Sequence, residues 1–289
     1  MRIPKDLTGS LNRFRLRTLF AMVTVLACFC AAVAWFDLLG PAGDIFRLKR
    51  ISYGQASSVA FAMGRLDSHD PLVQREAISA LGRIGPSARS AVSRLIEILA
   101  EDKLTDSLVD SGPTDHADVS WATFTTSSNA AWAIGNIGPT DAVASTALKD
   151  ALKSKNRYTR EYAAYAISRH GGTVASAIPE LIAALDDDHV AFLAARALGE
   201  MGRPGVVAIP KLTKLLALTN DARAESATAL SSLSAYSQLP DETMLKLNEL
   251  RNDPEEYVRK AASDAIALIE TYQLDATSSV TPVDAPKTS

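Results

Sequence analysis

The sequence predicts an all-α protein: an α-solenoid of about six two-helix hairpins, preceded by one transmembrane helix. Aromatic residues make up only 6% of the 289 residues while alanine is abundant, which suits closely packed helices better than a β-sandwich or barrel. A pattern of small and apolar residues recurs along most of the chain. A long uncharged stretch precedes this pattern.

The uncharged stretch, residues 18–36, is long enough to cross a membrane. Its 19 residues would span roughly 28 Å as a helix, close to the ~30 Å of a hydrocarbon core. Arg13, Arg15 and Arg17 precede it, and this charge bias keeps the N-terminus in the cytoplasm. We therefore predict a basic cytoplasmic segment at residues 1–17, a transmembrane helix or signal anchor at 18–37 and a linker at 38–53.

Two other interpretations of the stretch stay open. A cleaved secretory signal would end at "AVA", residues 32–34, and a lipoprotein signal would use "VLAC", residues 25–28, although Leu26 fits that pattern poorly. All three interpretations export the rest of the chain. We therefore expect a single-pass cytoplasmic-membrane protein with an extracytoplasmic, periplasmic repeat domain. Both cysteines, Cys28 and Cys30, fall in the stretch, so the repeat region has no disulfide.

Six stretches beyond Gly40 align with one another and define the repeat. Their equivalent positions are separated by 53, 33, 31, 32 and 36 residues, and the long first interval holds an insertion of about 21 residues. These positions are Gly82, Gly135, Ser168, Gly199, Ser231 and Ala267. A second apolar-periodic run follows each of the first five stretches, which predicts two helices per unit.

Small residues explain how the units stack and where their first helices stop. Alanines at the centre of the first helix, such as Ala130 and Ala131, let a neighbouring helix approach closely. Glycines spaced as Gly-x-x-Gly, such as Gly135 and Gly138, are predicted to end the first helix, and Pro139 follows to stop it continuing.

These residues resemble the HEAT family, in particular the short HEAT-like units associated with phycobilisome lyases, whose pattern is V-R-x-x-A-A-x-A-L-G-x-I-G. The stretch "VQREAISALGRIG" from Val73 shows it, and the resemblance covers about three quarters of the chain, residues 54–270. The family's arginine is present as Arg160, Arg223 and Arg259. The resemblance implies a curved, right-handed solenoid but no single activity.

Both ends of the repeat domain, residues 54–270, need caps. Residues 54–66 are predicted to form one helix that covers the first full unit. The last unit supplies only its first helix, with Asp253 as N-cap. The tail, residues 271–289, is rich in Ser, Thr and Pro and is predicted to be disordered.

The sequence has no motif that indicates catalysis. A Walker A loop, a nucleophile elbow, an HExxH motif and a Cys/His cluster are all missing. None of the four histidines precedes a glutamate, which excludes the diiron hydroxylases built on HEAT repeats. The acids of "DDDHV", residues 186–190, are better explained by the start of a helix than by a cation. We predict no catalytic residue, no cofactor and no metal.

Two surfaces are candidates for binding a protein. The insertion, residues 101–125, carries six acids and an aromatic pair; the alternatives are a tolerated surface loop and an ion site. The second helices offer charged side chains of both signs. The candidate partner-binding residues are Arg94, Glu97, Trp121, Phe124, Lys149, Glu180, Lys211 and Lys214.

The sequence therefore predicts a membrane-tethered HEAT-repeat scaffold that mediates protein–protein interaction on the extracytoplasmic side. Nucleic acid is not an expected partner, because residues 51–289 carry 22 Lys and Arg against 30 Asp and Glu. One alternative is a lyase-like accessory protein that handles a small ligand or chromophore in the concave groove. Another is a structural role with self-association.

Overall fold

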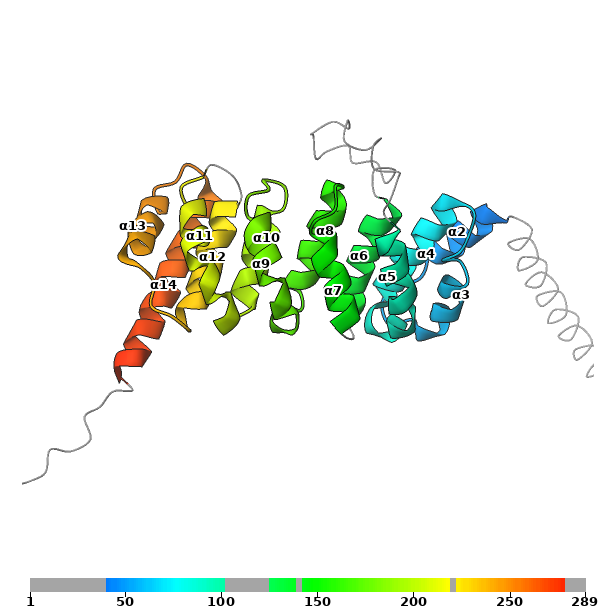
Figure 1. The fold of residues 1–289 in the computed structure, drawn as a ribbon, viewed down its shortest axis with the longest axis horizontal. Helices are drawn as coiled ribbons and strands as arrows, with labels where there is room; N and C mark the ends of the chain where they lie inside the picture. The colour runs from blue at the N-terminus through cyan, green and yellow to red at the C-terminus, as the bar shows by residue number, and fades with distance from the viewer. Residues whose placement is uncertain (1–39, 102–124, 139–141, 219–221, 279–289) are drawn as a thin grey trace, which may run out of the picture.

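The computed structural model describes residues 40–101, 125–138, 142–218 and 222–278, and all regular secondary structure in these ranges is helical. Figure 1 shows the helices arranged along the long axis of the molecule in chain order, from α2 at one end to α14 at the other. The predicted all-α solenoid is confirmed. Its right-handed sense stays a prediction.

The helices beyond residue 70 form two sets. The A helices, the first of each predicted unit, are α4 (Pro71–Ile84), α6 (Thr126–Ile137), α8 (Arg157–Ser168), α10 (Ala191–Glu200), α12 (Ala222–Ser234) and α14 (Glu256–Ser278). The B helices are α5 (Val92–Ala100), α7 (Ala142–Ala151), α9 (Ile178–Ala184), α11 (Ile209–Leu215) and α13 (Asp241–Leu250). Three short 3₁₀ segments, η2 (Gly85–Ala91), η5 (Gly171–Ala177) and η6 (Arg203–Ala208), lead into α5, α9 and α11.

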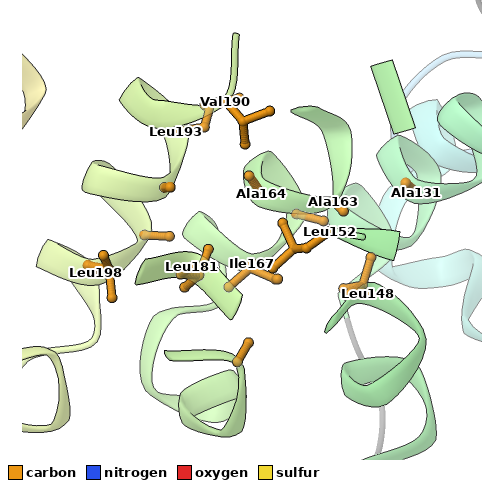
Figure 2. Packing of buried hydrophobic residues seen from close by; sticks show 14 of the residues in the cluster. Ala131, Leu148, Leu152, Ala163, Ala164, Ile167, Leu181, Val190, Leu193 and Leu198 are labelled. Carbon is orange, nitrogen blue, oxygen red and sulfur yellow. The ribbon is translucent and has the colours of Figure 1, made fainter. Parts of the chain in front are cut away.

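Each A helix packs against the A helix of the next repeat, so the A helices form one continuous row. Alanines make this possible: Ala130, Ala131, Ala163 and Ala164 are all fully buried. Larger aliphatic side chains fill the space between the A and B helices, and Figure 2 shows Ile167 of α8 and Leu181 of α9 among them. The core is therefore one hydrophobic cluster that runs from repeat to repeat.

The two glycines of the Gly-x-x-Gly motif have different roles in the structure. A Cβ on Gly135 would lie 2.8 Å from the Cα of Ala166 on the next A helix, closer than real Cβ contacts. Gly138 has φ +96°, where L side chains are strained, and it ends α6. Only the second glycine ends the helix as predicted, whereas the first allows two helices to approach.

The segment predicted as a linker, residues 38–53, contains a helix that belongs to the fold. This helix, α2 (Pro41–Lys49), packs against α4. The Arg83 guanidinium donates hydrogen bonds to the carbonyls of Leu48 (2.7 Å) and Ile51 (3.1 Å), and Leu48 is fully buried. The linker prediction is corrected, because a nine-residue helix is shorter than the window over which helical periodicity is recognised.

Both predicted ends of the repeat domain also differ from the structure. Residues 54–66 form a short 3₁₀ segment, η1 (Ala56–Ser58), and then α3 (Val59–Met63), rather than one helix. At the other end α14 continues to Ser278, so residues 271–278 of the predicted disordered tail are helical. Residues 279–289 and most of the insertion, 102–124, lie outside the described residues.

The predicted membrane localisation is corrected. In the described ranges no helix combines the length and the apolar character needed to cross a membrane. The longest of these helices, α14, has 23 residues, but charged residues such as Arg259, Asp264 and Glu270 interrupt its apolar sequence. This finding contradicts a single-pass membrane protein with an extracytoplasmic repeat domain. The predicted anchor, residues 18–37, lies outside the described residues.

Candidate functional site

The B helices carry the charged residues that the sequence proposed for partner binding. Arg94 and Glu97 lie on α5, Lys149 on α7 and Glu180 on α9, and the remaining two, Lys211 and Lys214, lie on α11. The aromatic candidates Trp121 and Phe124 lie outside the described residues. The structure thus distributes the described candidates over four successive B helices.

Arg94 is held by carboxylates of its own chain. Its Nε and Nη2 donate to Asp67 Oδ1 at 2.9 and 2.7 Å, and its Nη1 donates to Glu97 Oε2 at 2.7 Å. Hydrogen bonds to Glu97 and Asp67 raise the pKa of Arg94 above its ordinary value. Arg94 therefore ties α5 to the turn after α3, which leaves its charge largely satisfied within the protein.

The charges on α9 and α11 are also paired across repeats. Lys153 Nζ donates to Glu180 Oε1 at 3.1 Å, and Lys211 pairs with Asp186. Burial acts to raise the pKa of Glu180, but a hydrogen bond from Lys153, a backbone hydrogen bond and the charges of Lys153 and Lys149 together outweigh it, and the pKa lies below its ordinary value. These pairs join each B helix to its neighbouring repeat.

The acids of "DDDHV" pair with neighbouring repeats and hold the turn before α10. Arg160, the family arginine, donates from Nε to Asp187 Oδ2 at 2.7 Å, and the backbone N–H of His189 donates to Asp187 Oδ1 at 3.1 Å. Within the described ranges, no three His, Cys, Asp or Glu residues gather as a metal site would require. The carboxylates of residues 186 and 187 serve ion pairs and the start of α10.

An open groove of about 880 Å³ lies between α5 and α7. The α5 side is lined by Ile96, Leu99 and Ala100, and the α7 side by apolar residues that include Ala142 and Val143. The Val143 side chain is 64% exposed, so apolar area is open to solvent along the groove. A partner that covers this surface would release its water.

One end of the groove is polar. Its lining there comes from the last turn of α7, the turn that follows it and the first turn of α8, and comprises Asp150, Lys153, Ser154, Lys155 and Thr159. Thr159 is only 1% exposed, yet its hydroxyl oxygen has no hydrogen-bond partner in the structure. Buried polar atoms are nearly always paired. The described residues hold three other such atoms, on Glu180, Arg223 and Ser226, so this hydroxyl does not by itself identify a ligand site.

Sequence reasoning missed the groove because its two helices are separated in the chain by the insertion. The residues it missed include Val143, Lys155 and Thr159. One signal was present: residues 149–160 carry five Lys and Arg against one Asp, in a region whose overall charge is negative. That local excess of basic residues indicates the polar end of the groove.

Two family models match parts of the chain. Residues 73–101 match the PBS lyase HEAT-like repeat, and residues 145–234 match HEAT repeats. These matches support a HEAT-type repeat protein, as the resemblance implied. No curated protein matches the sequence significantly.

Solved structures show the same architecture. One engineered protein is 23% identical over 74% of this chain and 97% of its own, with a TM-score of 0.53. A second engineered protein is 21% identical over 74% and 98% of the two chains, also with a TM-score of 0.53. A designed armadillo repeat protein in complex with the peptide (KR)4 is 19% identical over 73% and 99%, with a TM-score of 0.47. At these identities the similarity concerns the fold alone.

Proposed function

We propose that the protein is a HEAT-type scaffold that binds a segment of a partner protein in the groove between α5 and α7. The observation that carries the proposal is the open groove of about 880 Å³ with an apolar lining. Elsewhere on the B helices several charges are engaged with one another, as Arg94 is with Asp67 and Lys211 with Asp186. A HEAT-type repeat scaffold fits a protein-interaction role.

The proposal assigns binding rather than catalysis. The polar side chains that line the groove are hydroxyls, lysines and one carboxylate, Asp150, without a histidine or cysteine among the lining residues. Acid–base or nucleophilic chemistry usually needs such a group beside a suitable partner. The lyase-like alternative stays a prediction, and a chromophore bound to protein purified from its own cells would favour it.

Val143 offers a direct test of the groove. The variant Val143→Asp places a charge in the apolar lining, at the start of α7 where an acid is tolerated by the helix. Val207 is a matched control, because it is 65% exposed, lies in η6 and lines no part of the groove. The full-length chain and both variants serve as baits for affinity purification from native cells.

The expected result is one stoichiometric partner retained by the wild type and by Val207→Asp. Val143→Asp should retain at least roughly tenfold less, since a charge in a binding hot spot commonly costs this much. Circular dichroism of the three baits checks that they fold equally. Equal retention by all three baits, or no stoichiometric partner on any of them, would overturn the proposal.

A further inference from the structure

The groove changes from apolar to basic along α7. Ala142 and Val143 line it at the start of this helix, and Lys153 and Lys155 line it just beyond the helix end. The ten residues of α7 separate the two ends by about 15 Å. A ligand that lies along α7 therefore meets an apolar surface first and ammonium groups at the far end.

The basic end stands out against an acidic background. Residues 149–160 carry five Lys and Arg and one Asp, whereas residues 51–289 as a whole carry 22 basic against 30 acidic residues. Glu180 and Asp187 of the next repeat pair with two of these basic residues, and the others remain to attract an acidic ligand. Such a local reversal of sign favours one binding position and one orientation.

Lys155 is the basic side chain most available to a ligand. Lys153 is paired with Glu180 and Arg160 with Asp187. Lys155 is exposed and forms no ion pair with any described residue. Asp150 also lines the groove, is exposed and has no ion pair with a described residue. Its negative charge therefore repels an acidic ligand that Lys155 attracts.

We infer that the groove binds a partner segment with apolar side chains at one end and an acidic group at the other. This inference rests on the proposed function and adds the chemistry of the partner. The apolar side chains lie against Val143 and its neighbours on α5, and the acid lies at Lys155. About five residues of extended peptide span the ~15 Å between the two ends.

A library of random peptides displayed on phage is the probe that tests this inference. Selection uses the full-length wild-type chain, with Val143→Asp and Val207→Asp in parallel. Peptides enriched on the wild type and on Val207→Asp, but not on Val143→Asp, are groove ligands. We expect them to carry apolar residues and, about five residues away in either direction, Asp or Glu.

The affinity of an enriched peptide for charge-removing variants then shows whether the charges of the groove contribute to binding. Lys155→Gln should weaken binding roughly three- to tenfold, because it removes one charge-assisted contact. Asp150→Asn should strengthen binding, since it removes the opposing carboxylate. Lys260→Gln removes an exposed lysine on α14 and should change nothing. Binding should also weaken in 1 M salt, where the Debye length falls to about 3 Å.

The outcomes distinguish this inference from the proposed function. The proposed partner chemistry is overturned if the groove ligands lack acids, or if their affinity is the same for Lys155→Gln, Asp150→Asn and the wild type. The groove then remains a binding site. Enrichment that is equal on Val143→Asp overturns both. Self-association that Val143→Asp abolishes assigns the groove to a second copy and overturns the inference. Peptide binding that appears only after residues 104–122 are deleted assigns it to the insertion and overturns it as well.

Discussion

At the scale of one residue, Thr159 in the wall of the groove is expected to reduce stability. Its hydroxyl is buried without a hydrogen-bond partner in the described structure. Because an unpaired buried hydroxyl costs free energy, Thr159→Val should raise the free energy of unfolding by about 1 kcal/mol. Urea denaturation measures this change.

The control for this prediction is the same substitution at a satisfied hydroxyl. Thr213 is buried, and its Oγ1 contacts Ile209 O at 2.9 Å and Thr243 Oγ1 at 2.8 Å. Thr213→Val should therefore lower the free energy of unfolding by about 1 to 2 kcal/mol. If Thr159→Val lowers the free energy of unfolding as Thr213→Val does, the Thr159 hydroxyl has a hydrogen-bond partner in solution and the prediction is wrong.

Glu180 makes stability depend on pH. Its pKa is lower in the folded chain than in the unfolded one, so it contributes stability at neutral pH that is lost as the pH falls through the folded pKa. Glu180→Gln should cost less than about 1 kcal/mol at pH 7, because the partner Lys153 is 61% exposed. The difference from the wild type should shrink below about pH 4. Urea titrations at pH 7 and pH 3 measure it, and an equal difference at both values contradicts it.

At the scale of helices, the approach of α6 to α8 depends on one missing side chain. Gly135→Ala would place a Cβ 2.8 Å from the Cα of Ala166, and backbone atoms cannot move aside as a flexible side chain can. The expected loss is about 1 to 3 kcal/mol in the free energy of unfolding, which is typical of overpacking. Thermal and urea unfolding measure it.

Gly64→Ala is the matched control. A Cβ at this position would meet nothing nearer than 3.5 Å, and the glycine does not have a positive φ. Stability should stay the same or increase slightly, because alanine reduces the entropy of the unfolded chain. Similar losses in the two variants would show that the Gly135 effect comes from replacing any glycine and not from the helix contact.

The sequence predicts helices well and pairs between helices poorly. Alanine spacing located the six A helices because helical periodicity is a local property. It did not reveal that Arg94 is bound to Asp67, which lies 27 residues earlier, so an apparently free charge turned out to be paired. The groove was missed for the same reason, since it exists only where α5 and α7 meet. The short helix α2 needed Arg83, on a different helix, to hold it.

At the scale of the whole molecule, ion pairs link neighbouring repeats, as the hydrophobic core does. Arg160 on α8 pairs with Asp187 before α10, and Arg196 on α10 pairs with Glu225 on α12. Few of these contacts reach beyond the next repeat, so stability should be approximately a sum over adjacent units. Damage to one interface should then spread little further along the stack.

The Arg223–Asp253 pair allows this locality to be measured. Its atoms lie 3.0 Å apart, the side chains are only 10% and 6% exposed, and Asp253 also accepts a hydrogen bond from Glu255 N. Asp253→Ala should cost about 3 kcal/mol, because it leaves the Arg223 charge buried without its partner. Hydrogen exchange followed by mass spectrometry should speed up in α12, α13 and α14 and stay unchanged in α4, α6 and α8.

A variant near the other end of the stack tests the same locality from the opposite side. Gly135→Ala should speed exchange in α6 and α8 and leave α14 unchanged, because α14 packs against α12 and α13 at the other end of the row. Opposite patterns in the two variants are expected of a protein whose repeats open as separate neighbours. A uniform increase along the chain in both variants would show instead that the repeats unfold as one cooperative unit, and the groove would then respond to damage anywhere in the molecule.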